Sequence, residues 1–95
     1  MTKEKLREIV AHYRKRFEEQ GVELAPHPHN KILTNRDRAI AHLADMLPKM
    51  EQMIKEDKIG KVMRWLGFVQ GTLWALGLDT IEELKEINRP DEVPV

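Results

Sequence analysis

Hydrophobic residues recur three and four positions apart through most of this 95-residue chain. That spacing places them on one face of an α-helix, and no segment alternates with the period of two that marks a strand. The pattern divides into three long segments and one short one. We therefore predict an all-α fold, with residues 1–90 forming a single helical domain and residues 91–95 a frayed tail.

The first helix is predicted from Lys3 to Gln20, with Thr2 as N-cap and Gly21 as the C-terminal stop. The second is predicted over residues 36–56, with Thr34 or Asn35 as N-cap. Its apolar stripe continues across Pro48, so we expect a kink there and not a break.

The third helix, residues 58–77, follows after a very short connection for which Asp57 is the expected N-cap. The two long helices, 36–56 and 58–77, should form an antiparallel hairpin with the first helix packed across them. Apolar side chains cover most of the circumference of the third helix, so we expect it to be central and enclosed by protein.

A short C-terminal helix should start at Thr80, because Thr80 and Glu83 match a capping box. Ile81, Leu84 and Ile87 are expected to point inward, and the helix should stop near Asn88, before Pro90.

Composition limits the class of protein. The chain has no cysteine, its net charge is zero, and it has neither a signal-peptide core nor a membrane-spanning run. These features predict a cytoplasmic protein without disulfides and make nucleic acid an improbable partner. Because the remaining helices of so short a chain would not cover the third helix fully, we expect a homo-oligomer, at least a dimer.

Three glycines, Gly60, Gly67 and Gly71, share one side of the third helix with Arg64. Glycine inside a helix costs about 1 kcal/mol relative to alanine, so something should offset that cost. One interpretation is close packing against another helix, within the chain or across a dimer. The other is a ligand-binding floor, with Arg64 and Lys61 supplying positive charge and Trp65 a stacking surface.

Two further regions carry candidate ligand-binding residues. Asn35 and Arg36 begin the second helix, where exposed N–H groups favour an anion, although a simple cap explains them equally well. Tyr13 lies beside three cations in the first helix, an arrangement suited to stacking on a base, but its place on the apolar face also predicts core packing.

The loop of residues 21–35 contains His27 and His29 around Pro28. His12 or His42 is a conceivable third metal ligand, but no metal-binding signature completes a site, and His42 also fits an ordinary surface pair with Asp45. No nucleophile elbow, phosphate-binding loop or facing carboxylate pair is present. We therefore expect neither enzymatic activity, nor a metal, nor a cofactor.

The segment RWLGFVQGTLWALGL (64–78) is followed by TIEELKEINRP (80–90) and preceded by NRDRAIAHL (35–43). These segments resemble a group of short uncharacterised phage and prophage helical proteins that carry an RWLGFVQGxLW block, here residues 64–74. The resemblance implies a viral context inside an infected bacterium, but no mechanism.

By analogy with small helical phage proteins that sequester the cyclic nucleotide signals of bacterial immunity, we expect a non-enzymatic protein that binds a nucleotide-type ligand. The alternative is a helical adaptor or inhibitor that docks a host or phage protein.

Overall fold

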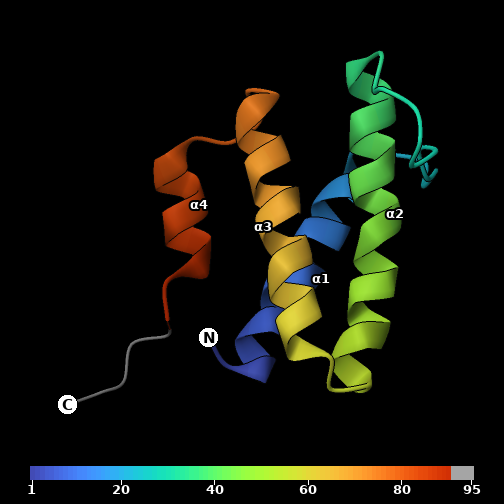
Figure 1. Ribbon diagram of the computed structural model, residues 1–95. Helices are drawn as coiled ribbons and strands as arrows, with labels where there is room; N and C mark the ends of the chain where they lie inside the picture. The colour runs from blue at the N-terminus through green and yellow to red at the C-terminus, as the bar shows by residue number, and fades with distance from the viewer. Residues whose placement is uncertain (91–95) are drawn as a thin grey trace.

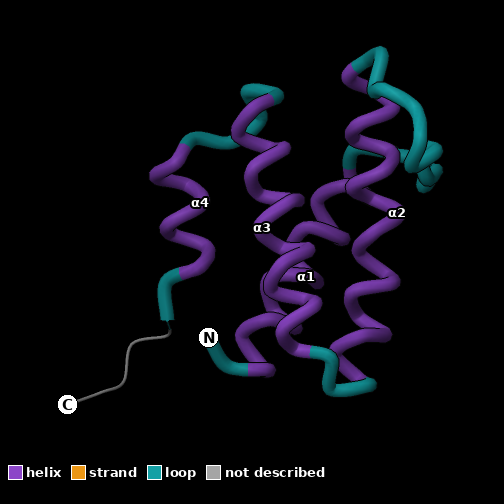
Figure 2. Tube along the Cα trace, viewed as in Figure 1, coloured by secondary structure: helices purple, strands orange, loops and turns teal. Residues whose placement is uncertain are grey.

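The computed structural model describes residues 1–90 and is all-helical over that range, as predicted. Its elements, in chain order, are α1 (Lys3–Glu19), α2 (Arg36–Lys55), α3 (Ile59–Ala75) and α4 (Ile81–Asn88), shown in Figure 1. Loops make up the rest of the described chain (Figure 2). The helix bounds differ from the predicted ones by one or two residues, and the proposed tail, 91–95, lies outside the described residues.

Side-chain caps start three of the helices. Thr2 accepts a hydrogen bond from the Lys5 N–H, and Asn35, not Thr34, caps α2 by accepting from the Arg38 N–H at 2.9 Å. The capping box at α4 is present in both directions, since Thr80 and Glu83 each bond the other's N–H. The predicted caps of α1 and α4 are confirmed.

The predicted cap of α3 is wrong. Its N-cap is Lys58, which makes no side-chain cap bond, and Asp57 has a left-handed backbone with φ of 62°. The short connection explains this, because α2 ends in a Schellman turn in which Lys58 N–H bonds Met53 O at 2.9 Å. Asp57 is the left-handed residue of that turn and is therefore used to end α2.

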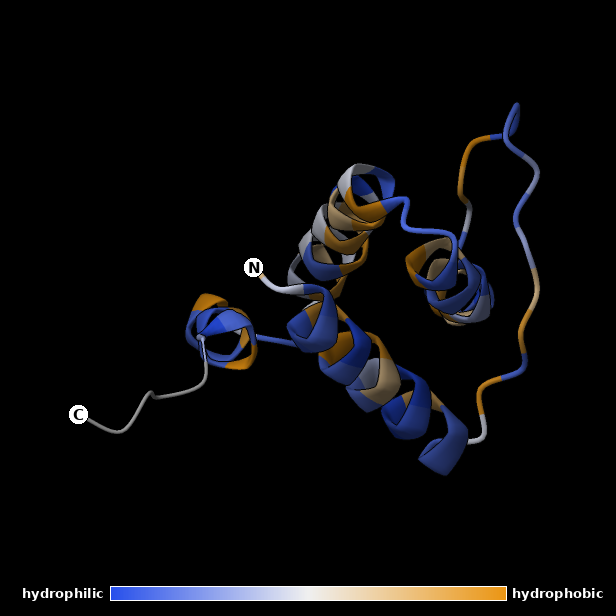
Figure 3. Ribbon diagram, turned by 90° about the horizontal axis from the view of Figure 1, so that it is seen from below, coloured by the Kyte–Doolittle hydropathy of each residue, from blue (hydrophilic) through white to orange (hydrophobic). Residues whose placement is uncertain are grey.

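The helices α2 and α3 form the predicted antiparallel hairpin, and α1 crosses behind it (Figure 1). Seen from below, these three helices surround a common interior and α4 stands to one side (Figure 3). The buried core comes from α1, α2 and α3 in turn: Leu6, Ile9, Val10, Tyr13, Phe17; Ala39, Leu43, Ala44, Met46, Leu47, Met50, Met53, Ile54; Val62, Leu66, Val69, Leu73.

Within the single chain, α3 is enclosed on one side and uncovered on the other, and its enclosure by a second copy stays a prediction. Met63, Phe68 and Trp74 are 46%, 54% and 55% exposed. A Cβ atom added to Gly67 or Gly71 would meet nothing within 4 Å. The reason is geometric: α1 and α2 pack on one side of α3, while α4 lies beside it and leaves the opposite side uncovered (Figure 3).

The short helix α4 is held loosely and contains no buried residue. Ile81, expected to point inward, is 50% exposed, whereas Ile87 is partly buried against the core. Polar contacts do most of the anchoring. Asn88 and Gln70 exchange reciprocal amide hydrogen bonds of 2.7 and 2.8 Å.

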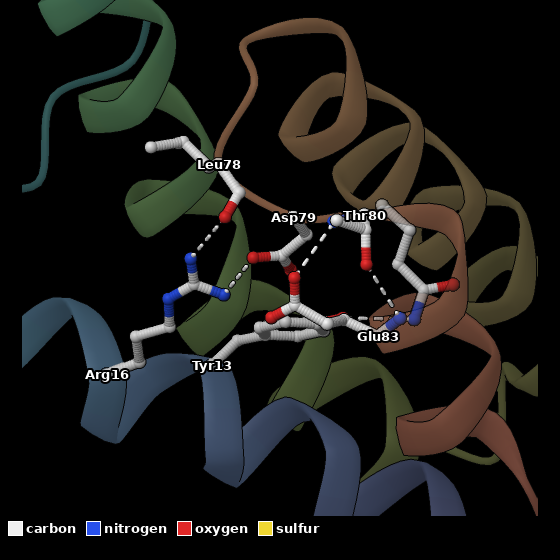
Figure 4. Close-up of polar contacts among 7 residues, drawn as sticks. Tyr13, Arg16, Leu78, Asp79, Thr80 and Glu83 are labelled. Atoms are coloured by element: carbon white, nitrogen blue, oxygen red, sulfur yellow. Dashed lines mark hydrogen bonds and ion pairs between the residues drawn. The ribbon is translucent and has the colours of Figure 1, made fainter.

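A buried ion pair fixes the turn between α3 and α4. Asp79 is 8% exposed, and its carboxylate lies 2.7 Å from the Arg16 guanidinium of α1 (Figure 4). Arg16 also donates to the Leu78 carbonyl at 3.4 Å. Because an unpaired buried charge is costly, this pair ties the start of α4 to α1. Within residues 1–90, no helix has the length and apolarity required to cross a bilayer.

Candidate functional site

A groove runs along the hairpin where the loop of residues 22–35 folds back over α2 and approaches α3. It consists of two adjoining cavities of about 350 and 450 Å³ that share His29, His42 and Phe68. We call it the α2–α3 groove. Its remaining lining residues are Pro26, His27, Pro28, Lys31, Leu33, Ala39, Leu43, Asp45, Met46, Lys49, Arg64, Trp65 and Thr72.

The loop is attached to α2 by two hydrogen bonds. Ala25 N–H donates to the Ala41 carbonyl at 3.3 Å, and His27 N–H donates to His42 Nδ1 at 2.9 Å. The His27 ring closes the loop on itself, since its Nε2 lies 3.1 Å from the Lys31 carbonyl. A carbonyl only accepts, so His27 carries its proton on Nε2, and its Nδ1 is buried without a hydrogen-bond partner.

His42 is the centre of this attachment. Because its Nδ1 accepts a backbone N–H, the ring must be neutral with the proton on Nε2. Burial lowers the pKa of His42 below its ordinary value of 6.5, while the nearby carboxylate of Asp45 acts in the opposite direction. The ring also makes edge-to-face contacts with His29 and Phe68, with centroids 6.4 and 6.3 Å apart.

Arg64 lies at the α3 side of the groove, next to Trp65. It is exposed, and one of its guanidinium nitrogens is 3.7 Å from the position that a Cβ of Gly60 would take. Within residues 1–90 no ion pair connects it to a carboxylate. The glutamates of α4 have other partners: Lys85, the Thr80 N–H and Arg89 for Glu82, Glu83 and Glu86 respectively.

Two further charged residues, Asp45 and Lys49, line the same cavity as Arg64. Lys49 and Asp45 form an ion pair at 2.7 Å, so they largely neutralise each other. Lys61 does not line the groove, but its ammonium group lies 5.6 Å from the Trp65 ring centroid, in a cation–π contact. Arg64 therefore leaves this part of the groove with an uncompensated positive charge beside an aromatic surface.

The structure brings together only some of the residues predicted for a site. Arg64 and Trp65 line the same cavity, and Lys61 contacts Trp65. Asn35 and Arg36 line neither cavity. Because the hairpin is antiparallel, the start of α2 lies beside the end of α3, at the opposite end from Arg64 (Figure 1).

Tyr13 lies in the core, away from the groove. It is 1% exposed, and its hydroxyl accepts a hydrogen bond from the Gln70 side chain at 3.1 Å. Burial raises the pKa of the Tyr13 hydroxyl. Of the two interpretations of Tyr13, the structure supports core packing.

Sequence reasoning missed the role of Phe68, Lys49 and the three histidines His27, His29 and His42. The Pro-His-Pro-His loop was visible, but nothing local indicated that it folds back onto α2. Within residues 1–90, no group of three or more His, Cys, Asp or Glu side chains is arranged to hold a metal ion. What they provide is hydrogen-bonding rings beside an aromatic wall.

Chemically, the groove combines one guanidinium without an ion pair, two aromatic surfaces and three imidazole rings. Such a set suits a flat ligand that carries a negative charge, because rings stack on aromatic faces and arginine binds phosphate with two parallel hydrogen bonds.

Comparisons with models of protein families, with curated proteins and with solved structures find no match for this chain.

Proposed function

We propose that this protein binds and sequesters a small nucleotide-type ligand in the α2–α3 groove, without converting it. The observation that carries the proposal is Arg64, which stands exposed beside Trp65 with no acidic partner among residues 1–90. A phosphate would pair with its guanidinium, and a base would stack on Trp65 or Phe68. The cavities are in the volume range of ordinary ligand sites, about 300–1,000 Å³.

The biological setting is part of the proposal. The resemblance of residues 64–74 to phage proteins favours an accessory protein that acts in the cytoplasm of an infected bacterium, against a nucleotide signal of host defence. The lack of cysteine and of a spanning helix in residues 1–90 is consistent with that setting.

The test is a thermal-shift panel of linear and cyclic nucleotides on the parent protein and on Arg64→Lys. A ligand at a hundred times its Kd should stabilise the fold by about 2.7 kcal/mol. Arg64→Lys should weaken binding at least tenfold, because lysine cannot form the bidentate contact. It should leave the melting of the free protein nearly unchanged, because Arg64 is exposed and unpaired.

Arg7→Lys is the matched control, since Arg7 is an exposed arginine of α1 that lies outside the groove. It should bind as the parent does. If no nucleotide shifts the parent, or if Arg64→Lys and Arg7→Lys bind equally, the proposed site is wrong. Chromatography of the bound compound, released by denaturation, separates sequestration from turnover: an intact compound supports the first, and a product contradicts it.

The alternative, an adaptor or inhibitor that docks another protein, is favoured by a different observation. The uncovered side of α3 exposes Met63, Phe68 and Trp74, and large exposed apolar side chains mark interaction surfaces when they are contiguous. Under this alternative the parent protein would bind no nucleotide of the panel, and substitutions on that side of α3 would abolish capture of a host or phage protein.

A further inference from the structure

We propose that the uncovered side of α3 binds the same side of a second copy of this chain, with the two helices antiparallel and Gly67 at the two-fold axis. We define this surface, the outer face of α3, by Gly60, Met63, Gly67, Phe68, Gly71 and Trp74. The outer face borders the ligand groove: Phe68 belongs to both, and the Arg64 guanidinium lies beside Gly60. The inference does not depend on the identity of any ligand.

The glycines give the first argument. Gly67 and Gly71 lie inside α3 with ordinary helical backbone, and open space surrounds both positions where a Cβ would stand. No contact within residues 1–90 therefore requires glycine there, although each glycine weakens the helix. Large apolar side chains border them, so the surface is suited to the close approach of another backbone.

The arrangement of large and small residues indicates a second copy as the occupant. Trp74 lies seven positions after Gly67, and Gly60 lies seven positions before it. Gly71 lies four positions after Gly67, and Met63 lies four positions before it. In an antiparallel pair about Gly67, Trp74 of one copy therefore faces Gly60 of the other, and Met63 faces Gly71. A single helix thus carries both the protruding and the receding halves of the contact.

Charge complementarity supports the same direction. The cations of α3, Lys61 and Arg64, lie in its first half, and α3 contains no acidic residue. A parallel pair would place Arg64 against its own copy. An antiparallel pair separates the two arginines and brings each basic end toward the partner's opposite end, where Glu82 and Glu83 begin α4 beside Trp74.

The size of the outer face of α3 sets the expected affinity of the dimer. A helix of 17 residues is about 25 Å long, so one helical face is smaller than the roughly 800 Å² per partner of a standard stable interface. We therefore expect a dimer that forms reversibly in the micromolar range, and whose population depends on concentration.

The first test is light scattering of the full chain from ~1 to ~100 µM, the range in which a micromolar dimer changes population. The parent should pass from monomer to dimer. Gly67→Gln should weaken dimerisation by about ten- to a hundredfold, because its side chain fills the contact. It should still fold, since open space surrounds position 67. Ala11→Gln adds the same side chain at an exposed position of α1 and should dimerise as the parent does.

The second test uses the absence of cysteine in the chain. A single Gly67→Cys should form an intermolecular disulfide under mild oxidation, because the two copies of residue 67 meet at the axis. Gly60→Cys should not cross-link, since the two copies of residue 60 would lie about 21 Å apart along an antiparallel pair. The reverse result, with only Gly60→Cys cross-linked, would indicate another register and overturn the proposal.

A parent protein that stays monomeric over the whole concentration range also overturns it, and leaves a different protein as the partner of this surface. A dimer that Gly67→Gln does not weaken would assign dimerisation to another surface and likewise refute the inference.

Discussion

The two sides of α3 differ in what explains them. The inward side is fixed by the chain's own packing, since each of its large aliphatic residues is buried against α1 or α2. The outward side has no such explanation, because its aromatic residues are half exposed and its glycines face open space. The inward residues are Val62, Leu66, Val69 and Leu73, and the outward ones are Gly60, Met63, Gly67, Phe68, Gly71 and Trp74.

Hydropathy alone does not distinguish the buried side of α3 from its exposed side. Both sides of α3 are apolar, but branched and aliphatic residues lie on one and glycine, methionine and aromatic residues on the other. Aliphatic side chains fill a core at low entropic cost, whereas aromatic residues and methionine are enriched where proteins bind partners. Within α3, the type of apolar residue therefore separates the two sides where periodicity does not, although methionine and aromatic residues are also buried in the core that α1 and α2 supply.

The largest expected effect contrasts two adjacent residues of α3. Leu73→Ala should lower the free energy of unfolding by about 3 kcal/mol, because Leu73 is fully buried and its loss leaves a cavity. Trp74→Ala, on the outer side, should cost less than about 1 kcal/mol in dilute protein, where no partner covers it. Urea denaturation at low micromolar concentration measures both, and equal losses would remove the distinction between the two sides.

A smaller loss of stability is expected from a substitution that affects the border between the two sides of α3. Gln70 is buried at that border, and its amide exchanges two hydrogen bonds with Asn88 of α4. Asn88→Ala should cost about 1–2 kcal/mol, because it leaves part of a buried amide unpaired. Lys85→Ala, on the exposed surface of the same helix, is the control and should change little. Hydrogen exchange should show faster opening of α4 only in Asn88→Ala.

Substitution of a glycine on the outer face of α3 should increase stability, whereas the two preceding substitutions decrease it. Gly67→Ala should raise the free energy of unfolding of the monomer by about 1 kcal/mol, because alanine is the better helix former and meets no neighbour. Gly77→Ala is the matched control. Gly77 has φ of 71°, so the same substitution there should destabilise by about 1 kcal/mol. A loss of stability in dilute Gly67→Ala would mean that the space at position 67 is not open.

The elements that local rules determine were predictable from the sequence. The capping box at Thr80 and the glycine stop at Gly21 depend on a few neighbouring residues, and the helical periodicity with the short connection predicts the hairpin. The prediction that Asp57 caps α3 is wrong because aspartate serves both as an N-cap and as a left-handed turn residue. Only the Schellman bonds that end α2 decide between these roles.

The candidate site was only partly predictable, because it depends on contacts between distant residues. The proximity of Arg64 and Trp65 follows from their adjacency in the sequence, but the contact of His27 with His42 spans 15 positions and depends on how the loop folds back. Likewise, Asn35 and Arg36 have the same anion-binding chemistry as Arg64, but the direction of the hairpin places them at its other end.

The smallest expected effect tests how the loop covers the edge of the outer side, where His42 contacts Phe68. Protonated His42 cannot accept the His27 N–H, and burial lowers its pKa in the fold. The unfolded chain therefore binds more protons than the folded one just below pH 6.5, the ordinary value for histidine. The stability that neutral His42 contributes is complete above that pH and is lost as the pH falls through the lowered pKa.

We expect this loss to be the smallest of the effects, because the ring is only partly buried and the nearby Asp45 carboxylate opposes the effect of burial. His42→Asn keeps an acceptor near Nδ1 but does not titrate. Its stability relative to the parent should therefore be higher at pH 5.5 than at pH 7.5, measured by urea denaturation. The groups that face His42 are His27, His29, Asp45 and Lys49, and all are retained in this variant. If the difference between variant and parent is the same at both pH values, proton binding by His42 does not control the attachment of the loop.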